Sequence, residues 1–190
     1  MGVLDSKRCK LISAAKGLLW KLGYESMSPR KVLEVSGAGQ GSLYHHFKGK
    51  KHLAAVALEE ISTNMCADAD RMFDESAPPF TRLRRFLEAE RDGMTGCQLG
   101  RFANEQSIHD RTLRKPIERY FQHVHRHVVL ALQGAKRRGD LPKTVNVDSL
   151  AASLLATVQG GYVLSRIYQD GAYVRHATHG AWRTLQSLRT

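Results

Sequence analysis

Apolar residues recur every three or four positions along most of the chain, which is the spacing of one face of an α-helix. The longest such stripe begins at Leu113 and Ile117 and reaches Leu132. No stretch of useful length alternates apolar and polar residues with the period of a β-strand. The sequence therefore predicts an all-α fold with about nine helices. Their expected ranges are about 11–22, 29–35, 40–46, 50–73, 81–92, 98–106, 111–138, 147–169 and 172–188.

Residues with strong capping preferences mark several of these boundaries. Ser28 is a good N-cap, and Pro29 suits the first helical position, where no N–H is needed. Gly23 is expected to end the first helix in the left-handed conformation. Asn146 and Asp148 are both suitable caps for the helix that runs to about residue 169, and the sequence leaves the choice between them open.

Basic residues exceed acidic ones and are concentrated near the N-terminus. The 190 residues include 29 Lys and Arg against 18 Asp and Glu, a formal net charge of +11. Residues 1–52 alone hold 10 Lys and Arg against 3 Asp and Glu. Such an excess favours an acidic partner, for example nucleic acid. We therefore expect a basic head joined to a nearly neutral body.

The composition argues against several other classes of protein. Hydrophobic residues make up 42% of the chain and charged residues 25%, as in soluble globular proteins. No uninterrupted apolar stretch approaches the roughly 18 to 20 residues of a membrane span, and residues 1–30 lack a secretory signal pattern. Cys9, Cys66 and Cys97 are odd in number and widely spaced, which argues against a disulfide scaffold and a zinc ribbon. We expect a cytoplasmic protein without a membrane partner.

The signatures of common catalytic sites are missing from the sequence. It contains no G-x-S-x-G run and no Walker loop. Gly37, Gly39 and Gly41 do not form a dinucleotide-binding fingerprint, because no strand is expected before them. We therefore expect neither an enzyme nor a bound cofactor.

Residues 28–53 have the layout of a helix-turn-helix motif, in which a glycine-containing turn joins two short helices and the second enters the DNA major groove. Leu43 and Phe47 are four residues apart and are expected to face the protein interior. The other side chains of the second helix suit DNA, because glutamine pairs with adenine, serine donates to a base or phosphate, and tyrosine and histidine bind phosphate oxygens. These outward residues are Gln40, Ser42, Tyr44, His45 and His46, and they are followed by Lys48, Lys50 and Lys51.

This segment and the helix before it resemble the DNA-binding region of tetracycline-repressor-like (TetR/AcrR) bacterial transcription regulators. The similarity is carried by Leu11-Ile12-x-Ala14-Ala15, Leu18-Leu19, Gly23-Tyr24, Gly37, the run Gly41-Ser42-Leu43-Tyr44-His45-His46-Phe47, Lys50 and Leu53. The resemblance implies a DNA-binding domain of three helices over residues 1–52 and an effector-binding and dimerisation domain over residues 53–190. It also implies DNA contacts by Ser28, Arg30, Gln40, Ser42, Tyr44, His45, His46, Lys48 and Lys50.

A ligand pocket and a dimer are the two properties that the resemblance implies for the second domain. The candidates for the pocket are apolar and aromatic residues of the central helices. They are Phe73, Phe86, Met94, Cys97, Leu99, Phe102, Tyr120, Val124 and Tyr162. In the family, the last two helices pair with those of a second copy. The stripe expected to form this face is Leu150, Leu154, Val158, Gly161, Leu164 and Ile167, with Ala181, Leu185 and Leu188. Packing within a single chain is the alternative for both sets.

His123, His125 and His127 raise the hypothesis of a metal site. At 100° per residue only His123 and His127 share a helix face, and two ligands are too few for zinc. A third ligand from another helix, such as His109, would be needed. A solvated helix face is the preferred interpretation, so no metal is expected.

The resulting hypothesis is a ligand-responsive repressor that binds a palindromic DNA operator as a homodimer and is released by a small-molecule effector. Two alternatives are kept. One is a non-inducible DNA-architectural protein on the same fold, and the other is a small-molecule enzyme or sequestering protein with a basic head.

Overall fold

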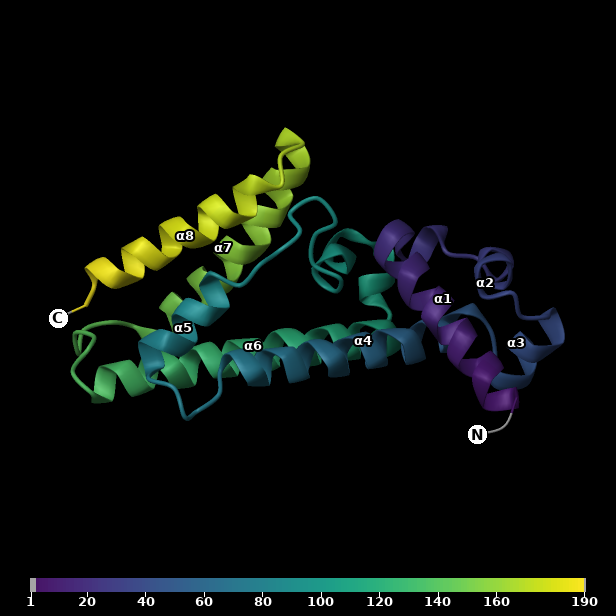
Figure 1. Cartoon of the computed structure of the whole chain (residues 1–190), viewed down its shortest axis with the longest axis horizontal. Coiled ribbons are helices and arrows are strands. Elements are labelled where there is room, and N and C mark those ends of the chain that lie inside the picture. Colours follow the sequence, from purple (N-terminus) through teal and green to yellow (C-terminus); the bar gives the residue numbers. More distant parts are fainter. Residues whose placement is uncertain (1–2, 190) are drawn as a thin grey trace. The chain divides into compact units, whose positions relative to one another are not determined.

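The computed structural model describes residues 3–189, and these residues form helices and connecting turns without any β-strand (Figure 1). The all-α prediction is confirmed. The α-helices are α1 (Val3–Ser26), α2 (Pro29–Ser36), α3 (Gln40–His46), α4 (Lys50–Met72), α5 (Pro79–Leu87), α6 (Arg111–Arg137), α7 (Val147–Tyr168) and α8 (Ala172–Ser187). Two short 3₁₀ helices, η1 (Gly100–Asn104) and η2 (Gln106–His109), precede α6.

The chain forms two compact units, and each draws on separate parts of the sequence. The first unit contains the residues up to Asn64 together with Gln98–Tyr120. The second contains Met65–Cys97 and the residues from Phe121 onward. Helices α4 and α6 each contribute to both units.

In the first unit, α1 contacts α2 and α3 through its apolar face. Leu11 and Leu19 of α1 are fully buried, as are Val32 of α2 and Leu43 of α3. Their spacing along α1 follows the helical stripe expected from the sequence, so the burial of this stripe fixes the positions of the two short helices.

The regular part of α1 ends at Gly23, although its backbone differs from the expected left-handed cap. Gly23 has φ 81° and ψ 174°, which lies outside the left-handed helical region, and the chain makes one further turn to Ser26. A Cβ atom at this position would overlap the carboxylate of Glu105. The glycine therefore provides both the positive φ and the space for Glu105.

The capping residues of α2 act as the sequence predicts. Ser28 Oγ accepts a hydrogen bond from the N–H of Lys31 at 3.2 Å, and Pro29 occupies the first turn. Gly37 is left-handed, with φ 64° and ψ 14°, and its N–H donates to the carbonyl of Leu33 at 3.0 Å. These two local signals hold the helix that precedes the turn into α3.

The second unit is organised around the pair α7 and α8, which lie side by side (Figure 1). Asn146 is the residue that caps α7, because its Oδ1 accepts from the N–H of Ser149 at 3.0 Å. A Cβ atom at Gly161 would lie 2.8 Å from Val174 Cα, so the two backbones can approach only because residue 161 is glycine.

Helix α5 is shorter than predicted, and the following segment is not a regular α-helix. The predicted range was about 81–92, whereas α5 ends at Leu87. Asp92 Oδ1 accepts from the N–H groups of Met94 at 2.9 Å and Thr95 at 3.2 Å, which closes a turn instead of a helix. Residues 98–106, also predicted as helical, contain the 3₁₀ helix η1 and the first residue of η2.

Among the described helices, α7 is long and apolar enough to cross a membrane by length and composition alone. The core helices of soluble proteins can have the same length and hydropathy, so this helix alone does not indicate a membrane span. It carries Asp148 near its start and Arg166 in its last turn, and its buried face packs against α8.

Candidate nucleic-acid interface

Helix α3 has one buried and one exposed side. Leu43 and Phe47 are 1% and 2% exposed, as expected for the inward positions. Gln40, Tyr44 and His45 are exposed, and Tyr44 retains 55% of its accessible surface. The exposed side therefore combines an amide, a phenol and an imidazole on a short helix held by two apolar side chains.

Two other predicted DNA-contacting residues of α3 are only partly exposed. Ser42 and His46 are half-buried, and the Ser42 Oγ and His46 Nε2 atoms have no hydrogen-bond partner among the described residues. The His46 ring lies 4.9 Å from the ring of His45 and 6.2 Å from that of Phe47, measured between centroids. In this arrangement both polar atoms are buried.

Helix α2, the first helix of the motif, carries an exposed arginine. Arg30 has a side chain that is 89% exposed, and its Nε donates to Glu34 Oε1 at 2.9 Å. An exposed ion pair between residues four apart on a helix is weak, so Arg30 is free to change partner. Ser28 is already committed to capping α2 through its hydroxyl.

The lysines at and just before the start of α4 differ in the contacts that they already make within the protein. Lys48 is exposed, and its backbone N–H donates to His52 Nδ1 at 3.1 Å. Lys50 Nζ lies 4.2 Å from the centre of the Tyr24 ring and donates to the carbonyl of Glu25 at 3.3 Å. Burial raises the pKa of the Tyr24 phenol, against the opposing charge of Lys51.

Lys51 has an intramolecular partner that the sequence did not indicate. Its Nζ donates to Asp110 Oδ2 at 3.1 Å, while Asp110 Oδ1 accepts from the N–H of Thr112 at 2.8 Å at the start of α6. The hydrogen bond from Lys51 and the backbone hydrogen bond from Thr112 lower the pKa of Asp110.

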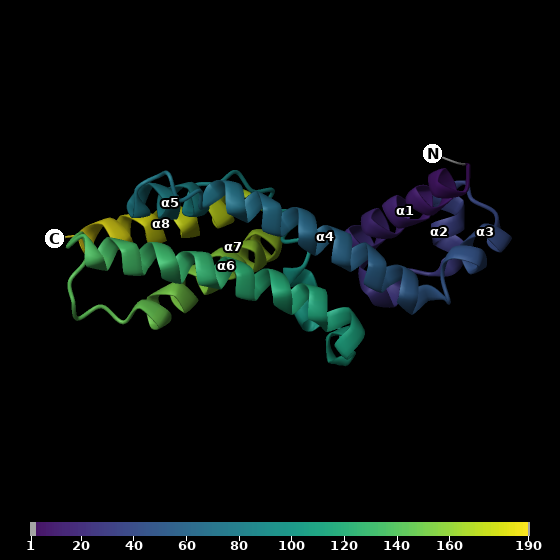
Figure 2. The same ribbon diagram turned by 90° about the horizontal axis from the view of Figure 1, so that it is seen from below.

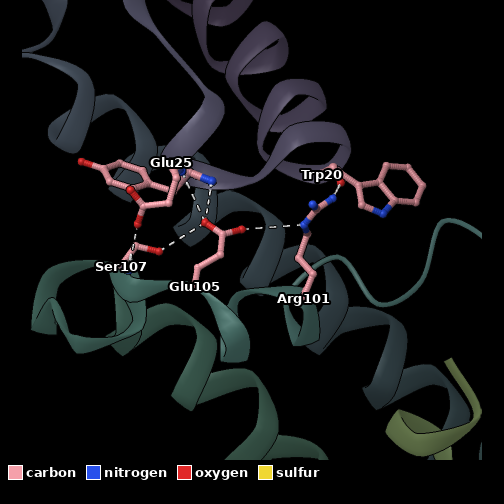
Figure 3. A network of polar contacts seen from close by, with 6 residues as sticks. Trp20, Glu25, Arg101, Glu105 and Ser107 are labelled. Atoms are coloured by element: carbon pink, nitrogen blue, oxygen red, sulfur yellow. Dashed lines mark hydrogen bonds and ion pairs between the residues drawn. The ribbon is translucent and has the colours of Figure 1, made fainter. Parts of the chain in front are cut away.

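A polar network anchors the end of α1 to η1 and η2 (Figure 3). Glu105 Oε2 accepts from the N–H of Tyr24 at 2.8 Å, and its Oε1 lies 3.9 Å from Arg101 Nε. Arg101 Nη1 also donates to the carbonyl of Trp20. Glu25 Oε1 accepts from the N–H of Ser107 at 3.0 Å. No sequence pattern indicates this network, because the partners in these hydrogen bonds are about 80 residues apart.

The nine predicted pocket residues are divided between the two units. Leu99, Phe102 and Tyr120 belong to the first unit. The second unit contains Phe73, Phe86, Met94, Cys97, Val124 and Tyr162. Among these six, the rings of Phe73 and Phe86 lie 5.5 Å apart, whereas Met94 is 41% exposed. Burial raises the pKa of Tyr162, against the opposing effect of nearby Arg91.

The second unit also contains a cavity of about 430 Å³, a volume typical of small-molecule sites. Its lining residues come from the segment after α5 and from the start of α8: Glu88, Ala89, Glu90, Arg91, Gly171, Val174, Arg175, Thr178 and His179. None of the nine predicted pocket residues is in this set. The sequence did not single out these positions, and no motif among them would have done so.

The predicted dimer stripe on α7 and α8 is divided between interior and surface. Leu154, Val158, Gly161 and Leu185 are buried within the single chain. Leu164 and Ile167 are 39% and 65% exposed, and neighbouring Val163 and Tyr168 add to the exposed apolar surface. The later part of α7 therefore carries an uncovered apolar patch, formed by Val163, Leu164, Ile167 and Tyr168.

A helix-turn-helix motif with a polar outer face is typical of DNA-binding transcription regulators. Family comparison agrees with this classification. Residues 11–57 match the family described as bacterial regulatory proteins, tetR family, and residues 79–181 match the tetracyclin repressor-like C-terminal domain. The chain belongs to the tetracycline-repressor-like family. Members of this family are non-enzymatic DNA-binding regulators, generally ligand-responsive repressors.

Individual relatives are similar over most of the chain. An uncharacterised HTH-type transcriptional regulator of Lactococcus lactis is 26% identical over 88% of this chain and 87% of its own length. The HTH-type transcriptional regulator TtgR of Pseudomonas putida is 23% identical over 80% of this chain and 77% of its own. A TetR-family regulator of Agrobacterium tumefaciens has the same fold, with a TM-score of 0.85, 21% identity and coverage of 98% and 100%.

Proposed function

We propose that the protein is a ligand-responsive repressor that binds a palindromic operator as a homodimer and is released by a small-molecule effector. The observation that carries this proposal is the exposed side of α3. Gln40, Tyr44 and His45 are exposed there, while Leu43 and Phe47 anchor the helix from beneath. A short helix presented in this way fits the major groove.

The exposed residues divide into base-reading and phosphate-binding groups. Gln40 is at the N-terminal end of α3, the end from which recognition helices contact base edges, and its amide suits adenine. Arg30 is exposed on α2 and can form a bidentate contact with guanine or phosphate. Tyr44, His45 and Lys48 supply hydrogen bonds and charge for the DNA backbone.

The remaining residues of the proposed interface are less available to DNA than these; they are Ser28, Ser42, His46 and Lys50. Ser42 Oγ and His46 Nε2 are buried, whereas Ser28 Oγ and Lys50 Nζ already form hydrogen bonds within the protein. We assign Ser28 and Lys50 the role of holding α2 and the start of α4 in place, and Ser42 and His46 require side-chain rotation to reach DNA. The proposed DNA-binding domain spans residues 1–52, and residues 53–190 form the proposed effector-binding and dimerisation domain.

The apolar patch on α7 supports a dimer. Ile167 and Tyr168 are 65% and 57% exposed, and the ring of Tyr168 stacks on that of Tyr173 of α8 at 4.6 Å. Exposed apolar patches of this kind commonly form protein interfaces. A two-fold dimer would present two α3 helices to a palindrome with half-sites about 34 Å apart.

Release by an effector follows from coupling between two sites. The effector is expected to bind more tightly to a dimer shape in which the spacing of the two α3 helices does not match that of the half-sites. Effector binding then weakens DNA binding, and DNA weakens effector binding by the same factor. The proposed pocket is within the regulatory domain, and the family's general behaviour supports it. Family members are in general soluble and cytoplasmic, and we propose the same location for this protein.

Selection of bound sequences from a random DNA pool tests the proposal. The full chain is expected to enrich a sequence with two-fold symmetry, and a panel of small aromatic compounds is expected to include one that reduces recovery of that DNA. Recovery without any enriched sequence would contradict base reading. Enrichment that no compound reduces would favour the non-inducible architectural protein, and turnover or storage of a compound without an operator would favour the enzyme or sequestering alternative.

A further inference from the structure

Three potential metal ligands converge in the second unit, where the later part of α4 lies beside α6 (Figure 2). The Nε2 atoms of His123 and His127 lie 2.7 and 2.8 Å from the same carboxylate oxygen, Oδ1 of Asp70. The two Nε2 atoms are 3.2 Å apart. The three atoms thus form a small triangle that joins two helices.

This triangle has nearly the size of one face of a metal coordination shell. In a site with bonds of about 2.0 to 2.2 Å, neighbouring ligand atoms are about 2.8 to 3.6 Å apart at octahedral or tetrahedral angles. The observed separations are 2.7, 2.8 and 3.2 Å. An octahedral face, with edges of about 2.8 to 3.1 Å, needs changes of only a few tenths of an ångström, whereas a tetrahedral face, with edges of about 3.3 to 3.6 Å, needs the two shorter edges to open by about 0.5 to 0.9 Å. Side-chain movements of less than about 1 Å therefore let an ion contact all three atoms.

Hydrogen bonds among the side chains of Asp70, His123 and His127 accommodate these atoms less well than a bound cation would. Both Nε2 atoms must carry a proton to donate to Asp70 Oδ1, and the two N–H groups then crowd a gap of 3.2 Å between the nitrogen atoms. A cation accepts one lone pair from each of the three atoms and removes this competition.

The surroundings hold the ligands while leaving access for an ion. His123 and His127 are four residues apart on α6 and so share one face of the helix. The ring of Phe73 stacks on that of His127, with centroids 5.2 Å apart and an angle of 11°. The histidine side chains are 21% and 18% exposed, whereas that of Asp70 is 55% exposed, so an ion can enter from solvent on the aspartate side.

We propose that Asp70, His123 and His127 bind a divalent first-row transition-metal ion, with Zn²⁺ as the representative ion. Two imidazole nitrogens favour such ions over Mg²⁺ and Ca²⁺, which prefer shells of oxygen atoms. The three protein ligands leave the remaining coordination positions to water. The bound ion joins α4 to α6 within the second unit.

Calorimetric titration of the untagged full chain with ZnCl₂ tests this site independently of DNA. We expect one ion per chain, and we expect Asp70→Asn, His123→Gln and His127→Gln each to weaken binding by at least about tenfold. The matched control is His125→Gln, because His125 is on the same helix between the two ligands but outside the cluster. This variant should bind Zn²⁺ like the parent chain, and MgCl₂ should give no comparable binding.

Two further measurements guard against misfolded variants and adventitious ions. Zn²⁺ should raise the thermal unfolding temperature of the parent chain and of His125→Gln, but not that of His127→Gln, whose far-ultraviolet circular dichroism should match the parent. Co²⁺ should give ligand-field absorption without a thiolate charge-transfer band. Unchanged Zn²⁺ affinity in the three ligand variants, an equal loss in His125→Gln, or a cobalt–thiolate band would each overturn the proposal.

Discussion

Replacing Glu105 by alanine is expected to destabilise the first compact unit at the end of α1. The Glu105 side chain is 16% exposed, and its carboxylate accepts from the N–H of Tyr24 at 2.8 Å and pairs with Arg101. Hydrogen bonds to charged groups contribute about 1.5 to 3 kcal/mol each, and removal of the carboxylate takes away the acceptor of the Tyr24 N–H. Since the Arg101 contact is longer, at 3.9 Å, we expect a loss of about 2 to 4 kcal/mol in total.

Urea unfolding of the full chain, followed by far-ultraviolet circular dichroism, measures this loss, and hydrogen exchange locates it. The amides of Tyr24 and Glu25 should exchange faster in Glu105→Ala, because both donate to Glu105 Oε2. The matched control is Glu34→Ala, whose side chain is 58% exposed in a weak helix-surface ion pair with Arg30. It should change the stability by about 0.5 kcal/mol or less. Equal small losses in both variants would refute the assigned role of Glu105.

Three further predictions concern packing, assembly and pH. Gly161→Ala should lower the thermal unfolding temperature, because the new Cβ atom would lie 2.8 Å from Val174 Cα. Ile167→Glu should shift the proposed dimer to monomer in sedimentation experiments, because it places a charge on the exposed apolar patch of α7. The pKa of Asp110 is lowered in the folded protein, so its carboxylate stabilises the fold at neutral pH and loses this effect as the pH falls through that pKa. Asp110→Asn should therefore reduce the dependence of unfolding on acid pH.

Each of these predictions has its own control and contrary result. Gly160→Ala introduces a methyl group with no described atom within 4 Å of it, so a loss equal to that of Gly161→Ala would argue against the close contact. Val35→Glu changes an exposed apolar residue of α2 and should leave the proposed dimer intact. An Asp110→Asn variant with the same acid unfolding curve as the parent chain would show that the ion pair with Lys51 contributes nothing measurable.

Local chemistry made some elements predictable from the sequence. The limits of α2 follow from Ser28, Pro29 and Gly37, whose conformational preferences operate over only a few residues. The division of α3 into inner and outer sides follows from the four-residue spacing of Leu43 and Phe47. These features need no knowledge of distant parts of the chain.

Features that depend on distant contacts could not be predicted in the same way. A Cβ atom at Gly93 would lie 2.5 Å from the carbonyl oxygen of Gly171, so the chain after α5 approaches a residue 78 positions away, and the sequence did not indicate this approach. Asp70 is 53 residues from His123, so the histidine pattern alone gave two ligands. Helical periodicity likewise could not separate the buried part of the α7 stripe from Ile167 on the surface.

Titration of Gln40→Ala against the selected operator and a scrambled duplex at fixed salt shows whether the outer side of α3 reads DNA bases. We expect the preference for the operator to fall by about 1 to 3 kcal/mol while binding to the scrambled duplex is unchanged. Lys48→Ala should instead weaken binding to both duplexes by a similar factor. Equal losses on the two duplexes for Gln40→Ala would contradict base reading by α3.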